Sequence, residues 1–273
     1  MDDWKCLFCD RGRPDVEMSH EHGVPKWIRR IPSVKKNIRL AKGAKYRDIP
    51  ITQLDPQTQS IRTEIVQTKT KALHVTQMTL DVCKTCNTGW MALLEEKIKH
   101  ILTPSIEGQD VKLTRAQATL VALWAAKTAA VAELDVPQMA VIDDAQRRTI
   151  LEQQIPEGFA VYSARAATPS HMTWVTRPGA RHPRQPDGRF GERSGTHVGV
   201  AMSAGHLMIL VRAIQPESAA AMLERCFPPL GSAWQQIWPL KTRSGPHLFH
   251  NAQSVNPIEA KNATGLEDRP VYA

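Results

Sequence analysis

Four of the five cysteines of this chain fall into two Cys-x-x-Cys pairs. Cys6 and Cys9 form the first pair, and Cys83 and Cys86 form the second. Two residues between the thiols let a short turn wrap one side of a metal ion, and two such pairs complete the tetrahedral ligand set of a structural Zn²⁺. The alternative is two unrelated pairs of buried cysteines. Because 73 residues, 10 to 82, separate the pairs, the fold must bring them together for a zinc site to form.

Further polar residues that could bind a metal or take part in catalysis lie near these pairs in the sequence. Glu21 and His22 are adjacent, and Asn87 directly follows the second cysteine pair. Carboxylate and amide oxygens are hard ligands that suit Mg²⁺ or Mn²⁺, and a histidine near its free pKa can deprotonate water at neutral pH. On its own, a Glu–His pair is typical of a solvated surface turn. A zinc ion that draws Cys9 and Cys86 together can bring Glu21 and Asn87 to one ion, so the context favours a catalytic metal site.

The charge of the chain is unevenly distributed. The formal net charge is +8, and residues 1–90 hold sixteen Lys and Arg against ten Asp and Glu, which gives +6 in the first third. A basic surface around a candidate active site favours a polyanionic partner such as DNA or RNA. The candidate phosphate contacts are Lys26, Arg29, Arg30, Lys35 and Lys36. The alternative is a solvated basic face. A second basic stretch, 177–195, is predicted to be a long loop.

The sequence indicates a cytoplasmic protein. The N-terminus is acidic and lacks the apolar core of an export signal. The most apolar run, 120–132, is interrupted by Lys127 and is too short to span a membrane, so we expect no membrane partner. In a reducing compartment, paired cysteines bind metal rather than form disulfides. No pattern specifies a protein partner or an oligomer.

The elements that must position these residues are of mixed type. Residues 61–82 alternate and are rich in β-branched types, which predicts two strands, interpreted as one hairpin. An amphipathic helix should follow the second cysteine pair and end at residues 103–104. Glu95 and Lys99 are expected to form an ion pair on its solvent-exposed face. Thr114 is a good N-cap for an Ala-rich core helix that runs to about residue 134. A third helix is expected from about residue 143 to 154.

Beyond residue 158 the pattern changes to strands. They are expected at 159–164, 171–176, 196–202 and 206–214, with a hairpin turn at 203–205, and a short strand is expected at 234–240. The fold class is therefore α+β. We predict a first domain over 1–103, a mixed domain of helices and mainly antiparallel sheet over 104–242, and a loose tail over 243–273.

The order of the motifs resembles the HNH (His-Me finger) endonucleases. Cys-x-x-Cys, then Glu-His-x-x-Pro, then Cys-x-x-Cys-Asn is similar to the subset with a four-cysteine zinc, and residues 86–95 resemble bacterial HNH proteins of unassigned role. The resemblance covers the first third of the chain and, more loosely, extends to about residue 240. It implies a zinc-stapled ββα-metal finger with a long insertion, 33–75. It also implies a metal-dependent endonuclease that hydrolyses DNA phosphodiester bonds.

The family pattern assigns roles to three residues of this sequence. It implies that His22 is the general base, and that Glu21 and Asn87 hold one Mg²⁺ or Mn²⁺. One position departs from the pattern, because many members have an asparagine five residues before the third zinc cysteine, where this chain has Met78. That departure favours the alternative function, a catalytically dead zinc-finger-like module that binds nucleic acid or protein. A pure zinc module, however, has no need of Glu21, His22 and Asn87 together.

Overall fold

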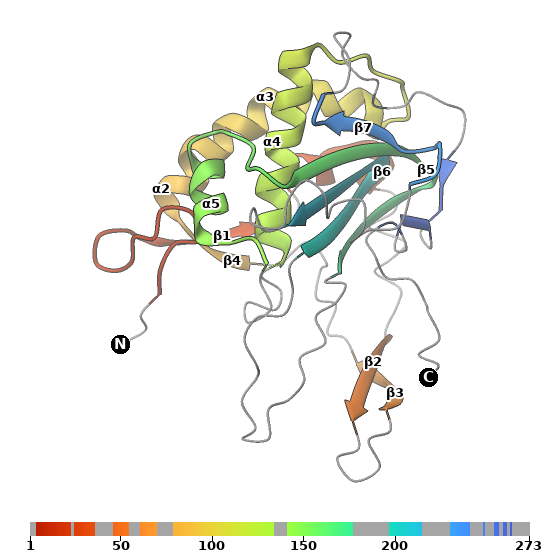
Figure 1. The fold of residues 1–273 in the computed structure, drawn as a ribbon, viewed down its shortest axis with the longest axis horizontal. Helices are drawn as coiled ribbons and strands as arrows, with labels where there is room; N and C mark the ends of the chain where they lie inside the picture. Colours follow the sequence, from red (N-terminus) through yellow and green to blue (C-terminus); the bar gives the residue numbers. More distant parts are fainter. Residues whose placement is uncertain are drawn as a thin grey trace.

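The computed structural model describes most of the chain, in separate ranges. These are residues 4–22, 25–35, 46–54, 61–69, 79–133, 141–176, 197–214 and 230–240, with 248, 254–256, 259, 260 and 263 near the C-terminus. The fold is α+β with antiparallel sheets, as predicted (Figure 1). Over these ranges, no helix is both long and apolar enough to cross a bilayer.

Two small sheets contain the strands of the first third. β1 (Met18–His22) pairs antiparallel with β4 (Thr79–Cys83), and β2 (Tyr46–Leu54) pairs antiparallel with β3 (Ile61–Lys69). The single hairpin predicted within 61–82 is therefore wrong, because the two strands found there have different partners. Alternation in a sequence identifies the faces of a strand but does not identify its neighbour. The pairing of β1 with β4 places Met18 opposite Cys83.

The helices follow β4 directly. A short helix α2 (Lys84–Cys86) continues into the turn η2 (Asn87–Met91), which is kinked at Gly89, and then into α3 (Ala92–Ile106). The predicted end at residues 103–104 is wrong, since α3 includes Pro104 in its last turn. A proline near the end of a helix removes only one hydrogen bond. The fully buried Ile106 holds the last turn against the core.

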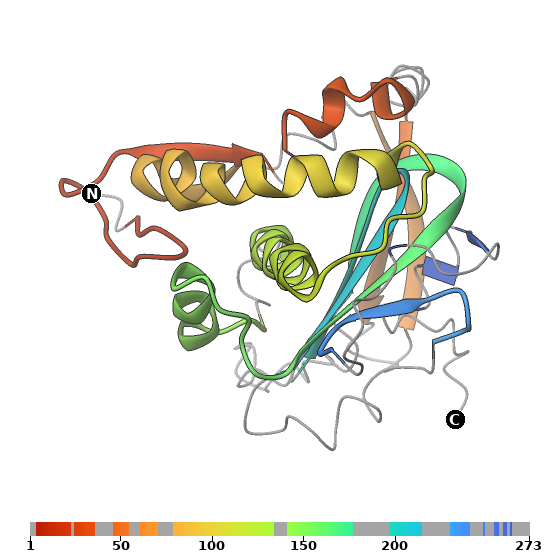
Figure 2. The same cartoon turned by 90° about the horizontal axis from the view of Figure 1, so that it is seen from above.

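The two later helices begin close to the predicted positions. In α4 (Arg115–Ala132) the side chain of Thr114 accepts a hydrogen bond from the backbone N–H of Gln117, and the Gln117 side chain accepts one from the Thr114 backbone. The same reciprocal pair, Asp143 and Gln146, begins α5 (Asp144–Leu151). Such capping boxes satisfy N–H groups that a helix start leaves without partners. Helices α3 and α4 lie on one face of the main sheet, and α5 lies beside α4 (Figure 2).

The main sheet is built on two long strands. β5 (Phe159–Thr176) and β6 (His197–Ile214) pair antiparallel, β7 (Gln235–Trp238) adds to the other edge of β5, and β8 (Ser254–Val255) pairs parallel with β5. The predicted turn at 203–205 is wrong, because β6 continues through it. Gly205 has φ 55°, and a Cβ there would overlap the carbonyl oxygen of Ile106. The glycine thus marks a close approach of β6 to α3 rather than a turn.

One cluster of buried side chains includes residues on both sides of position 103, among them Cys83, Ile98, Val121 and Val211. The division into two domains stays a prediction. The segment 243–273 is expected to be a loose tail, but four of its described residues are buried, namely Leu248, Val255, Ala260 and Ala263. Leu248 is fully buried, and the carbonyl oxygen of Ala263 accepts two hydrogen bonds, 3.1 and 2.7 Å long, from the Arg212 guanidinium.

Candidate metal centre and the adjoining polar site

The first cysteine pair lies in a tight turn near the N-terminus. The backbone N–H of Cys6 donates to the carbonyl of Arg11 at 2.9 Å, and the N–H of Asp10 donates to the carbonyl of Cys6 at 3.0 Å. Asp10 takes the left-handed conformation, with φ 56°. A Cβ on Gly12 would overlap the carbonyl oxygen of Trp4, so only glycine fits where the turn closes. The turn therefore holds the thiols of Cys6 and Cys9 close to each other.

The second cysteine pair lies where β4 passes into helix. Cys83 is the last residue of β4 and the N-cap of α2, and Cys86 is the last residue of α2. The backbone N–H of Lys84 donates to the carbonyl of Glu17 at 2.8 Å, immediately before β1. This bond and the β1–β4 register fix the start of the helix against β1.

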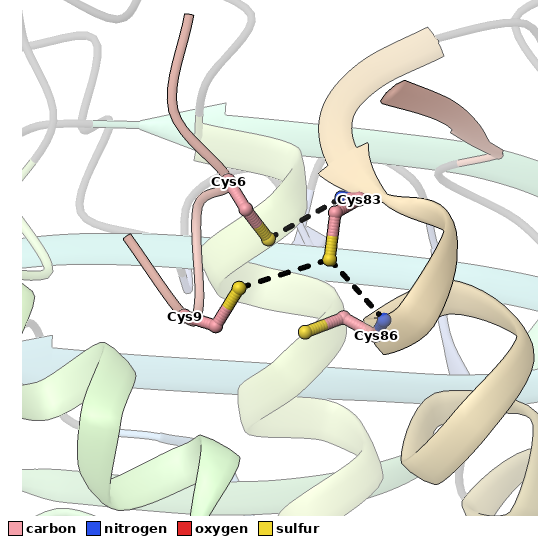
Figure 3. Close-up of side chains that lie close together, drawn as sticks. All are labelled: Cys6, Cys9, Cys83 and Cys86. Carbon is pink, nitrogen blue, oxygen red and sulfur yellow. Dashed lines mark hydrogen bonds between the residues drawn. The ribbon is translucent and has the colours of Figure 1, made fainter. Parts of the chain in front are cut away.

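The four sulfur atoms meet in one cluster. All four Sγ atoms lie within 4.8 Å of one another, and those of Cys9 and Cys83 are 3.7 Å apart (Figure 3). In a tetrahedral site with Zn–S bonds of about 2.3 Å, the sulfurs are about 3.8 Å apart. Cys6, Cys83 and Cys86 are buried, and Cys9 is partly exposed. The predicted convergence of the two pairs is confirmed, and the cluster could hold a metal ion.

Hydrogen bonds within the cluster shift the pKa values of Cys6 and Cys86 in opposite directions. A hydrogen bond from the Cys86 thiol lowers the pKa of Cys6 to about 4; burial opposes this effect, and backbone N–H groups, chiefly that of Cys83, add to it. The N–H of Cys83 lies 3.3 Å from Cys6 Sγ, and the N–H of Cys86 lies 3.4 Å from Cys83 Sγ. The pKa of Cys86 is raised because it donates to Cys6 and because it is buried. A bound cation would stabilise all four thiolates, so metal uptake releases protons.

A second polar contact adjoins the cysteine cluster. The side-chain amide of Asn87 donates from Nδ2 to the hydroxyl oxygen of Ser19 at 2.8 Å, and both residues are partly exposed. Asn87 is the first residue of η2 and follows the cluster residue Cys86, while Ser19 lies on β1. The bond therefore joins the start of the helix to the strand that contains Glu21 and His22. Because Nδ2 is the donor, the Oδ1 oxygen of the amide remains available as a ligand.

The backbone of β1 places the other two predicted site residues. Glu21 lies opposite Leu80 and His22 lies opposite Thr79. Alternate residues of a strand share a face, so residue 21 is on the same face as Ser19, about 7 Å further along the strand, and residue 22 is on the other face. Met78 lies outside the described residues.

Some of the predicted basic contacts lie on the segment after β1. Lys26, Arg30 and Lys35 are exposed, and Arg29, at the centre of the 3₁₀ turn η1 (Ile28–Arg30), is half-buried. Burial lowers the pKa of the Arg29 guanidinium. Lys36 and the stretch 177–195 lie outside the described residues. The exposed side chains of Lys26, Arg30 and Lys35 are accessible to a polyanion.

Sequence reasoning missed two residues beside the cluster, Ser19 and Trp90. Ser19 precedes Glu21 by two positions and so shares its face, which the strand period alone would have indicated. Trp90 follows Cys86 by four positions, but the backbone is kinked at Gly89 between them, so the helical spacing rule would not have identified it. Its ring packs edge-on against Phe8, between the first two cysteines, with ring centres 5.2 Å apart and an interplanar angle of 90°.

Comparison with known proteins places the chain in no family. No family model, no curated protein and no solved structure matches it.

Proposed function

We propose that this protein is a metal-dependent endonuclease of the HNH type that hydrolyses phosphodiester bonds of DNA. Cys6, Cys9, Cys83 and Cys86 would hold a structural Zn²⁺, and Glu21 and Asn87 would hold one Mg²⁺ or Mn²⁺. The proposal rests chiefly on one observation, the 2.8 Å hydrogen bond between Asn87 and Ser19. It ties the amide to the strand that contains Glu21 and His22, directly beside the four thiols.

The arrangement of elements supports this reading. Two antiparallel strands, β1 and β4, are followed at once by a helix, which is the order of a ββα-metal finger. The predicted metal ligands come from the first strand and from the helix start, and Ser19 on the face of residue 21 contacts Asn87. The segment that contains Lys26, Arg30 and Lys35 follows β1 directly, so the basic side chains begin next to the proposed site.

The proposed zinc has a structural role. It would join the N-terminal turn to the end of β4 and the start of the helix, and so fix the position of Asn87. Because the thiols are far apart in the unfolded chain, the free energy of metal binding contributes to folding. Thiolate ligands persist in a reducing compartment, which supports a cytoplasmic location.

The chemistry follows from the proposed roles. Glu21 and Asn87 would hold Mg²⁺ or Mn²⁺, which would supply Lewis-acid stabilisation of the negative charge that develops during phosphodiester cleavage. His22 accepts a proton from a water molecule as the water oxygen bonds to phosphorus. The bond between phosphorus and the 3′ oxygen breaks, and a solvent water molecule protonates the departing oxygen, which leaves a 5′ phosphate and a 3′ hydroxyl.

Plasmid cleavage by the zinc-loaded protein tests this function. Wild type should cut with Mg²⁺ or Mn²⁺ and not with EDTA, and the rate should rise with pH through the pKa of His22 and then level off, because only neutral imidazole accepts the proton. His22→Ala should lose about 10²–10⁴-fold in rate while it keeps its zinc and its fold. If wild type cuts no DNA or RNA, or cuts no faster than His22→Ala, the catalytic proposal is wrong.

The second candidate function is a zinc-stabilised binding module without cleavage activity. It is favoured by Met78, which occupies the position where the family pattern has an asparagine. This module would bind nucleic acid or a protein through the same basic segment. Salt-dependent DNA binding by a zinc-loaded protein that cuts neither DNA nor RNA would support it.

A further inference from the structure

Trp90 has an unused hydrogen-bond donor beside the cysteine cluster. Its indole Nε1 is buried and has no hydrogen-bond partner among the residues that the structure describes. A buried N–H without an acceptor costs about 1–3 kcal/mol, so its presence in a folded protein calls for an explanation. Trp90 follows Cys86 by four positions, across the kink at Gly89, and its ring lies against Phe8 of the first cysteine turn.

The surroundings of Trp90 connect it to both cysteine pairs. The contact with Phe8 joins its ring to the first pair, and Phe8 is almost fully buried, with 1% of its surface exposed. On the other side, the pKa of Cys86 reflects the neighbouring indole. The bond to Cys6 and burial raise this pKa, and Trp90 acts in the opposite direction because an N–H donor favours a thiolate.

The negative charge of a metal-bound cluster would be stabilised by such an N–H donor. Four thiolates and one divalent cation sum to a net charge of about −2, which N–H donors to the sulfurs stabilise. Backbone N–H groups already lie near two of the sulfurs, Cys83 N–H near Cys6 and Cys86 N–H near Cys83. No backbone N–H is seen near Cys86 Sγ within the described ranges, and the indole N–H of Trp90, which packs against the same core cluster, is an unpartnered donor in this region.

We propose that the indole N–H of Trp90 donates a hydrogen bond to the Cys86 thiolate of the metal-bound cluster, and that Trp90 thereby acts as a positioning residue that tightens metal binding. The proposal rests on the zinc part of the proposed function and is independent of the nuclease activity. Phe8 holds the indole ring in place from the opposite pair, so the bond links both turns to one ion.

A matched pair of substitutions tests the contribution of the donor. Trp90→Phe keeps an aromatic ring against Phe8 and removes the N–H together with the five-membered ring that contains it. Trp124→Phe is the control, since Trp124 on α4 also has a buried indole Nε1 without a described partner and lies in the same core cluster. Chelator competition should show that Trp90→Phe binds Zn²⁺ about 10–100-fold more weakly than wild type. Trp124→Phe should match wild type.

A direct measurement on the wild-type protein does not depend on how the variants fold. The protein is loaded with ¹¹³Cd²⁺ in place of zinc and labelled with ¹⁵N at tryptophan. A through-bond coupling between ¹¹³Cd and one indole proton, lost in Trp90→Phe and retained in Trp124→Phe, would establish the hydrogen bond. If neither this coupling nor the affinity difference is found in a protein that holds one metal ion, this inference alone is overturned. A folded protein that takes up no metal overturns the zinc part of the proposed function instead.

Discussion

At the scale of single residues, Ser19 decides which end of the Asn87 amide faces the proposed ion. Its hydroxyl accepts from Nδ2, so Oδ1 is left for a cation. Ser19→Ala should therefore raise the Mn²⁺ concentration for half-maximal cleavage roughly fivefold, which corresponds to a hydrogen bond of about 1 kcal/mol. Mn²⁺ titration followed by electron paramagnetic resonance should show the same loss without substrate.

Ser19→Thr is the control for this effect, since it keeps the hydroxyl and should stay near wild type. Saturating Mn²⁺ should restore the cleavage rate of Ser19→Ala, because the substitution leaves His22 unchanged. A lower rate at saturating Mn²⁺ with unaltered metal affinity would assign Ser19 to a different role.

At the scale of elements, a buried ion pair connects α3 and α4. Lys127 Nζ lies 3.0 Å from Glu95 Oε1, and only 2% of the Lys127 side chain is exposed. Glu95→Ala removes this carboxylate from a buried ammonium and should destabilise the fold by about 3 kcal/mol. Lys127→Met combined with Glu95→Ala should recover most of that loss, because a buried ion pair replaced by apolar groups is often neutral. Urea unfolding of wild type and the two variants measures this, and equal stability of the single and double variants would contradict it.

The ion pair between Lys127 and Glu95 illustrates which contacts a sequence can predict and which it cannot. The caps at Thr114 and Asp143, the core position of α4 and the convergence of four thiols follow from local rules, which a sequence displays directly. The partner of Glu95 does not, since Lys99 at the expected spacing lies 3.9 Å from Glu96 instead. Pairings between elements that are far apart in the sequence, such as β1 with β4, depend on tertiary packing. The alternation of residue types does not encode that packing.

At the scale of the whole molecule, the net charge of +8 should control association with nucleic acid. Exposed Arg30 and Lys35 lie on the segment after β1. Each phosphate contact removed should flatten the slope of log affinity against log salt by roughly one. We expect Arg30→Glu with Lys35→Glu to lower this slope by about two, measured by fluorescence anisotropy on a duplex. Lys97→Glu with Lys99→Glu on α3 is the control for a general change of charge. An equal effect of both pairs would show that binding is not localised to this segment.

The register of β1 and β4 also affects how this chain can change over evolution. His22 and Thr79 lie directly opposite each other, so the 56 residues from 23 to 78 leave and return at the same place. For a segment whose ends are pinned in this way, doubling its length costs only about 0.6 kcal/mol in loop-closure entropy. Ile28, Ile31 and Val34 belong to the main core, so insertions, deletions or exchanged modules that begin after residue 35 would leave the thiols and Asn87 in register. New recognition properties can thus arise in this later part of the segment without loss of the core that supports the cysteine cluster.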